Sequence, residues 1–211
     1  MTRCVIVGAS YETDINYMKN NINSDDYIIS ADAGLEKLIK IGILPNLIVG
    51  DFDSYKENLP KDIETLKFPI CKDNTDMLCA VKEGIKRGYN SFVLFGGIGG
   101  RLDHTIANLC VLEYLSDRGY NNLLLDKKNR AFIMGMEERV IQGSKGEYVS
   151  VFPFGTSSCN VSYEGLKYKL DKEILYSNIS SDPMGVSNSF LNDKAKIIVN
   201  AGKALVIISK D

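Results

Sequence analysis

Residues 91–104 read SFVLFGGIGGRLDH, which places a short apolar strand, a glycine-rich turn and the start of a helix in direct succession. The helical pattern continues to Arg118, because apolar residues recur at the spacing of one helix face. These residues are Ile106, Leu109, Leu112 and Leu115. A buried strand followed by a helix is the repeating unit of a parallel sheet that helices cover on both faces. The stretch therefore predicts an α/β fold.

The same alternation occupies the first 130 residues. Further short apolar runs, typical of buried strands, lie at Cys4–Val7, Tyr27–Ser30, Leu47–Val49 and Asn122–Leu125, and a second helical pattern covers Thr75–Arg87. We predict a Rossmann-like α/β domain with a parallel sheet over residues 1–130, with its boundary near Lys127–Glu138. Such sheets bind ligands beyond the carboxyl ends of their strands, so the loops at those ends are where chemistry is expected.

Residues 131–211 have a different pattern, because helical periodicity stops and short β-rich runs alternate with Gly, Ser, Asn and Pro. Strands are expected at Tyr148–Phe152, Asn160–Tyr163, Lys167–Leu170, Lys196–Val199 and Ala204–Ser209. Residues 200–203, NAGK, predict a hairpin turn between the last two strands. We predict a small all-β sandwich or barrel domain over residues 131–211.

The composition is that of an ordinary globular protein and argues against several classes of function. The chain has 211 residues, of which 45% are hydrophobic and 25% charged, and its formal net charge is −2. It has no basic excess to drive nucleic-acid binding, and its apolar runs are too short to span a bilayer. The five cysteines are scattered and never spaced C-x-x-C, so neither structural zinc nor a disulfide framework is expected. A cytoplasmic protein that binds no membrane or nucleic acid is expected.

Residues 47–54, LIVGDFDS, carry the strongest local indication of chemistry. The predicted strand ends in glycine, and Asp51 and Asp53 follow at positions i and i+2. Alternate side chains of an extended segment point the same way, so the two carboxylates can converge on one cation. Hard oxygen ligands of this kind suit Mg²⁺ bound to a phosphorylated substrate. The alternative is an Asx-turn, in which each aspartate bonds its own backbone.

More carboxylates occupy equivalent places, after predicted strands or at predicted helix starts. They are Asp32, Asp73, Asp76 and Asp103. Each has a structural alternative, since Asp73 or Thr75 can cap a helix and Asp76 can interact with the helix dipole. Taken together, such a group of like charges would repel unless a cation neutralised it.

The glycine-rich turn Gly96–Gly100 lets backbone N–H groups approach a phosphate closely, and Arg101 adds a forked positive charge. The turn is neither the dinucleotide fingerprint, because its third glycine position holds Leu102, nor a Walker loop. The alternative is a flexible turn that Asp103 caps. His104 is the single histidine of the chain, and it suits either a phosphate contact or a structural role.

Four motifs occur in the order found in bacterial thiamine pyrophosphokinases, which the chain resembles: ADAG at 31–34, GDFDS at 50–54, KDNTD at 72–76 and GIGGRLDH at 97–104. The resemblance continues through residues 106–108 and resumes at 149–153, 165–170 and 185–189. It therefore covers nearly the whole chain.

The resemblance implies an enzyme that transfers the pyrophosphoryl group of ATP to the hydroxyl of thiamine, giving thiamine diphosphate and AMP. The α/β domain would hold ATP and Mg²⁺. The β domain would help to bind thiamine, at the cleft of a homodimer.

The motifs also imply roles for individual residues. The acids expected to bind Mg²⁺ and the pyrophosphate are Asp51, Asp53 and Asp76, with Asp32 and Asp103 as supporting acids near the metal or the reacting hydroxyl. The residues expected to contact nucleotide phosphates are Thr75, Gly97, Gly99, Gly100, Arg101 and His104. Ser187 and Asn188 match the segment that meets the thiamine pyrimidine. The general base is left open among Asp51, Asp76 and Asp103, and Tyr163 and Phe190 are either aromatic partners of thiamine or core residues.

Two other functions are compatible with part of the pattern. A diphosphokinase for another heterocyclic alcohol, such as a pterin, would keep the N-terminal acids and change the C-terminal pocket, but the chain retains GVSNS at 185–189. A non-catalytic sensor of thiamine or nucleotide should have lost some of the acids, but all five are present.

Overall fold

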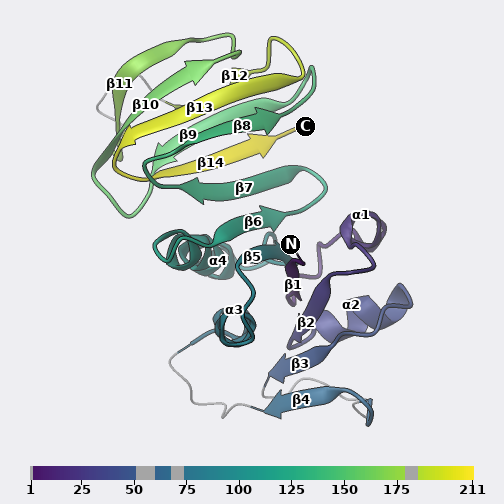
Figure 1. Cartoon of the computed structure of the whole chain (residues 1–211). Helices are drawn as coiled ribbons and strands as arrows, with labels where there is room; N and C mark the ends of the chain where they lie inside the picture. Colours follow the sequence, from purple (N-terminus) through teal and green to yellow (C-terminus); the bar gives the residue numbers. More distant parts are fainter. Residues whose placement is uncertain (1, 51–59, 68–73, 179–184) are drawn as a thin grey trace. The chain divides into compact units, whose positions relative to one another are not determined.

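The computed structural model describes residues 2–50, 60–67, 74–178 and 185–211 (Figure 1). The chain divides into two compact units, Met1–Lys127 and Lys128–Asp211. Asp51 and Asp53 of the sequence motif, and Asp73, lie outside the described residues.

The first unit alternates strands and helices. In chain order its elements are β1 (Cys4–Val7), α1 (Ile15–Asn21), β2 (Tyr27–Ala31), α2 (Gly34–Lys40), β3 (Leu47–Gly50), β4 (Glu64–Lys67), α3 (Asp76–Lys86), β5 (Ser91–Phe95), α4 (Leu102–Ser116) and β6 (Asn121–Leu125). The five strands and two longer helices expected from the sequence are present within one or two residues of the expected bounds. The elements that the sequence analysis missed are α1, α2 and β4, which are each only four to seven residues long.

All six strands of this unit are parallel, in the order β6-β5-β1-β2-β3-β4. The chain winds outward from β1 to β4 and then returns to place β5 on the other side of β1, with Val7 opposite Phe95. The β1–β5 pair is thus the point at which the direction of winding reverses. In open parallel sheets the crevice for ligands lies at this reversal, beyond the carboxyl ends of the two strands.

Burial on both faces explains why β1 and the first three residues of β3 are continuously apolar. All four residues of β1 are fully buried, as are Leu47, Ile48 and Val49 of β3. Helices cover both faces of a parallel sheet, so neither face can carry the polar residues that would mark a solvent-exposed side.

The helices begin and end where the sequence provides capping residues. The Thr75 hydroxyl accepts the Leu78 N–H (3.3 Å) at the start of α3, and the Asp14 carboxylate accepts the Tyr17 N–H (2.9 Å) at the start of α1. Gly88 and Gly119 adopt positive φ just beyond α3 and α4, as is common at helix ends. Within the described ranges, no helix combines the length and the apolar character needed to cross a membrane.

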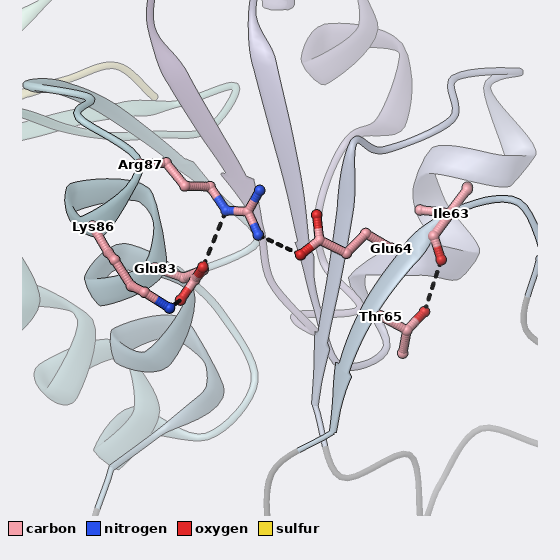
Figure 2. A network of polar contacts seen from close by, with 6 residues as sticks. All are labelled: Ile63, Glu64, Thr65, Glu83, Lys86 and Arg87. Carbon is pink, nitrogen blue, oxygen red and sulfur yellow. Dashed lines mark hydrogen bonds and ion pairs between the residues drawn. The ribbon is translucent and has the colours of Figure 1, made fainter.

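A polar network fixes the edge strand β4 to α3 (Figure 2). Arg87 donates one hydrogen bond to Glu64 of β4 (2.6 Å) and another to Glu83 of α3 (3.1 Å), and Lys86 lies 3.6 Å from Glu83. Exposed ion pairs contribute little singly, but one guanidinium here bridges two elements. The network holds a strand of four residues that only β3 pairs with among the described strands.

The second unit consists of strands. In chain order they are β7 (Asn129–Met134), β8 (Glu138–Gln142), β9 (Tyr148–Pro153), β10 (Ser158–Glu164), β11 (Leu170–Tyr176), β12 (Asn188–Ser189), β13 (Lys194–Ala201) and β14 (Ala204–Ser209). They form two antiparallel groups, β12-β9-β14-β7 and β11-β10-β13-β8. The mixed α/β class expected from the sequence is confirmed, with antiparallel strands after the α/β part.

Alternating burial in β10 and β13 creates the core of this unit. Cys159, Val161 and Tyr163 of β10 are buried, and the residues between them are less so. The expected turn between the last two strands is present, with Gly202 at φ +78°. The expected hairpin is wrong, because β13 pairs with β10 and β8, whereas β14 pairs with β7 and β9 in the other group. The expected strand Lys167–Leu170 is wrong. That segment is irregular, because Gly165 adopts φ +80° and the Tyr168 backbone bonds to a side chain instead of a strand.

Gly34 gives a direct test of the packing of α2 on β1. A Cβ at this position would lie 1.9 Å from the Val7 carbonyl oxygen, which is backbone and cannot move aside. We expect Gly34→Ala to lower the free energy of unfolding by about 1–3 kcal/mol or more, measured by urea denaturation. Gly135→Ala is the control, because no atom lies within 4 Å of its Cβ position. Equal stability of the two variants would contradict this packing.

Candidate functional site

A pocket of about 320 Å³ lies in the first unit, at the carboxyl ends of β1 and β5. It is lined by the loop after β1, the glycine-rich loop after β5, and the starts of α3 and α4. The residues predicted from the sequence that line it are Asp32, Thr75, Asp76, Gly97, Gly99, Gly100, Arg101 and His104. These residues come from segments that are far apart in the sequence, from Asp32 to His104, and the strand order brings them to one place.

Backbone hydrogen bonds join the two loops. Gly8 N–H donates to the Phe95 carbonyl (2.8 Å) and Ser10 N–H donates to the Gly96 carbonyl (3.1 Å), so the pairing of β1 with β5 continues beyond the strands. The loop after β1 is therefore held in contact with the glycine-rich loop.

This contact explains most of the glycines. Gly96, Gly99 and Gly100 adopt positive φ, where a side chain is strained. A Cβ would lie 2.4 Å from the Gly8 carbonyl oxygen at Gly96 and 2.3 Å from the Glu12 carboxylate at Gly99. The glycines at 96 and 99 thus allow the neighbouring loop to approach closely.

Asn108 of α4 fixes the glycine-rich loop by a hydrogen bond. Its side chain is 7% exposed, and its amide nitrogen donates to the Gly97 carbonyl (2.9 Å). A buried amide that satisfies a backbone carbonyl fixes the loop without occupying the pocket. Asn108 was quoted in the sequence only as part of a motif, and its role depends on α4 lying beneath the loop.

Asp32 stands at the end of β2 in a strained conformation. Its φ is +49°, which is uncommon for a residue other than glycine, although Asp tolerates it better than most. The Asp32 N–H donates to the Val49 carbonyl (2.8 Å), which fixes the residue between β2 and β3. Strain of this kind is concentrated at functional sites, and here it sets a carboxylate at the pocket.

Thr75 and Asp76 form the start of α3. Thr75 is the N-cap, as the structural alternative from the sequence proposed, and it also lines the pocket. Capping and ligand contact are compatible, because a helix N-terminus directs N–H groups toward an anion.

The Asp103 carboxylate forms an ion pair with Arg101. Arg101 Nε donates to Asp103 Oδ1 (3.1 Å) and Nη2 donates to Oδ2, while the His104 N–H donates to Oδ1 (3.0 Å). The hydrogen bond from Arg101 lowers the pKa of the Asp103 carboxyl. Both side chains are largely exposed, and Asp103 is not among the described residues that line the pocket.

The carboxylates at the pocket have the chemistry that Mg²⁺ requires, since Asp32 and Asp76 offer hard oxygen ligands. Gly50, at the carboxyl end of β3, immediately precedes Asp51. Among the described residues, no group of three or more acids, histidines or cysteines lies close enough to hold a metal alone. The two described acids therefore fit part of a cation site.

Ser187 and Asn188 lie in the second unit, in the segment 185–189 beside β9. Gly185 accepts the Val151 N–H (2.6 Å), and Ser187, at φ +56°, donates its N–H to the Ser150 hydroxyl (3.1 Å). The amide of Asn188 is buried and bonds both the N–H (2.9 Å) and the carbonyl (2.7 Å) of Tyr168. Asn188 thus joins two loops, and Ser187 stands beside it.

The two aromatic residues considered for thiamine stacking are core residues in the described structure. Tyr163 is 5% exposed, and Phe190 is 7% exposed and packs against Gly143, where a Cβ would lie 2.2 Å from its ring.

The sequence analysis missed the loop after β1, whose Ser10 and Tyr11 line the pocket. The glycine that ends the first strand was the available signal. It became informative only with the strand order, which makes β1 the neighbour of β5.

Comparisons with known proteins match both parts of the chain to the same family. Residues 18–130 match the family described as thiamin pyrophosphokinase, catalytic domain, and residues 137–205 match thiamin pyrophosphokinase, vitamin B1 binding domain. The thiamine pyrophosphokinase of Bacillus subtilis (strain 168) is 26% identical over 189 residues, which cover 87% of each chain. Its crystal structure has a TM-score of 0.88 at 23% identity, with full coverage of both chains. The yeast enzyme's structure has a TM-score of 0.77 at 15% identity, covering 99% of this chain and 86% of the other.

The Arg101–Asp103 ion pair should change the pH at which the Asp103 carboxyl titrates. The hydrogen bond from Arg101 stabilises the ionised form of Asp103, so the pKa of this carboxyl lies below its ordinary value of 3.8. The ion pair is therefore lost only as the pH falls through that lowered pKa. We expect Arg101→Met to move the pKa of Asp103 upward, measured from the carboxyl ¹³C shift by NMR.

Arg118→Met is the matched control, because this arginine bonds the Tyr114 carbonyl near the other end of α4. If Asp103 titrates alike in both variants, the ion pair is absent in solution.

Proposed function

Because the chain belongs to the thiamine pyrophosphokinase family, we propose that the pocket between the loops after β1 and β5 holds ATP for transfer of its pyrophosphoryl group to thiamine. The observation that carries this proposal is the gathering of Asp32, Thr75, Asp76 and the glycine-rich loop at the reversal point of a parallel sheet. The hydroxyl oxygen of thiamine attacks the β-phosphorus, the bond from the β-phosphorus to the oxygen of the α-phosphate breaks, and AMP leaves.

The chain supplies positioning and charge in this reaction. Phosphoryl-type transfer needs little covalent chemistry from a protein, because alignment of the hydroxyl with phosphorus and neutralisation of the oxygens lower the barrier. Thr75 and the N–H groups at the start of α3 face the phosphates. Arg101 adds charge once a phosphate competes with Asp103 for its guanidinium.

Asp51, Asp53 and Asp76 would hold Mg²⁺, with Asp32 as a supporting acid. Bound there, Mg²⁺ neutralises the oxygens of the polyphosphate. Support comes from the donor chemistry of Asp32 and Asp76 at one pocket and from the position of Asp51 directly after β3.

The base that accepts the hydroxyl proton is Asp51, Asp76 or Asp103. Before a ligand binds, Asp103 holds Arg101, and the hydrogen bond from Arg101 lowers the pKa of the Asp103 carboxyl. A phosphate that takes Arg101 from Asp103 removes this hydrogen bond, so the lowered pKa does not exclude Asp103 as the base.

We further propose that the two parts of the chain have separate roles. Residues 1–130 form the Rossmann-like catalytic domain and residues 131–211 the thiamine-binding β-sandwich, which the two family matches and the two compact units support. Ser187 would contact thiamine, with Asn188 holding its loop. A cytoplasmic homodimer with thiamine at the dimer cleft completes the proposal.

The proposal is tested with purified protein, ATP, Mg²⁺ and thiamine, by following nucleotide and thiamine products by chromatography. AMP and thiamine diphosphate in equal amounts support it. ADP and thiamine monophosphate would show transfer of a single phosphoryl group instead. Thiamine binding without turnover would indicate a sensor, and no thiamine binding would direct attention to other heterocyclic alcohols.

Asp53→Asn tests the metal assignment. Removing one ligand charge should lower turnover by about 100-fold or more at limiting Mg²⁺, while circular dichroism and thermal unfolding stay unchanged. Asp62→Asn is the matched control, because Asp62 is exposed in the turn before β4 and belongs to none of the motifs. Wild-type turnover in Asp53→Asn would remove Asp53 from the metal site.

A further inference from the structure

Tyr11 is an exposed aromatic residue at the pocket. Its side chain is 80% exposed, although the residue lines the pocket with the glycine-rich loop. Among the described lining residues it is the only Phe, Tyr or Trp. A large ring left open to water at the edge of a ligand pocket is a surface that a planar ligand can cover.

The Tyr11 ring lies beside Gly100, on a loop whose backbone is fixed by hydrogen bonds. A Cβ built on Gly100 would lie 3.1–3.8 Å from three atoms of the Tyr11 ring, so the ring rests along the bare backbone of this glycine. The loop itself is fixed by the Ser10 N–H bond to Gly96 and by the Thr13 hydroxyl, which donates to the Ser10 carbonyl (2.7 Å). Because the backbone of the loop is already fixed, stacking on a ligand costs little backbone freedom.

The neighbouring Glu12 indicates which part of a nucleotide lies here. Its carboxylate lies against Gly99, where a Cβ would be 2.3 Å from Oε2. A negative acceptor disfavours the polyphosphate at this end of the loop and favours a group that donates hydrogen bonds, such as a ribose hydroxyl. The polyphosphate then extends toward the start of α3, where Thr75 and Asp76 lie.

We propose that Tyr11 and Glu12 form the nucleoside end of the pocket, where the Tyr11 ring stacks on the base of the nucleoside triphosphate and the Glu12 carboxylate accepts a hydrogen bond from its ribose. This inference rests on the proposed function and adds the recognition of the nucleoside to it. Residues 8–12 precede the segment that matches the catalytic domain family, and the vitamin B1 binding match lies at residues 137–205. Tyr11 lines the same pocket as Thr75 and Asp76, which are proposed to face ATP, so the occupant that we propose is the base of the nucleotide and not a ring of thiamine.

Steady-state kinetics of Tyr11→Ala tests the stacking. We expect the KM for ATP to rise about tenfold, with kcat and the KM for thiamine within about twofold of the wild type. Inhibition by inorganic tripolyphosphate, which has no base, should be unchanged. Tyr11→Phe should behave as wild type, since it keeps the ring. Tyr176→Ala, which removes an exposed tyrosine from β11, is the matched control.

Glu12→Gln tests the ribose contact. Wild type should prefer ATP to 2′,3′-dideoxy-ATP, which lacks both ribose hydroxyls of ATP, and the variant should lose most of this preference. An unchanged preference would remove Glu12 from the subsite.

The outcomes separate this inference from the proposed function. An unchanged KM for ATP in Tyr11→Ala, or a rise confined to the KM for thiamine, would overturn the stacking while the reaction itself stands. If the wild type forms no AMP from any nucleoside triphosphate, the proposed function fails, and calorimetric titration with ATP decides the subsite instead. Weaker ATP binding by Tyr11→Ala than by Tyr176→Ala would support it, and equal binding would overturn it.

Discussion

The parallel pairing of β1 with β5 is the constraint on which the site depends. These strands are far apart in the chain, and their pairing is what reverses the direction of winding in the sheet. The hydrogen bonds from Gly8 to Phe95 and from Ser10 to Gly96 carry the pairing past the strand ends. Two loops are thereby held in contact at the carboxyl edge, and the pocket is the space that they and the starts of α3 and α4 enclose.

Close contacts between two backbone segments recur at glycines in this structure. Gly34 lies against the Val7 carbonyl, Gly96 against Gly8, and Gly185 against the Val151 carbonyl, where a Cβ would be 2.0 Å away. At each of these positions a side chain would push apart two segments of backbone that are in contact. Glycines in a motif are commonly attributed to ligand contact, but packing between the chain's own loops accounts for these directly, and the ligand then fits a surface that packing has already shaped.

Polar side chains at the site divide into those that hold the loops and those left for a ligand. Asn108 and Asn188 are buried, and their amides bond the backbone of another segment, so they define geometry. Arg101 and Asp103 are exposed and hold each other by an ion pair that a phosphate can replace, because exposed pairs are weak. Both classes occur in the same sequence motifs, which is why a motif alone does not distinguish a binding residue from a supporting one.

The sequence by itself determined the α/β class, the five main strands and two longer helices of the first unit, the change to β-rich structure after residue 130, and several of the residues that gather at the pocket. Local patterns sufficed there, because buried strands must be apolar, helix faces repeat, and chemistry lies after strands. Tertiary structure alone decided the short elements α1, α2 and β4, whose four to seven residues carry too little periodicity to be recognised. It also decided the irregular course of residues 167–169 and the inclusion of Tyr11. Both depend on which segment lies beside which, and that follows from strand order and from hydrogen bonds between distant residues that no local pattern encodes.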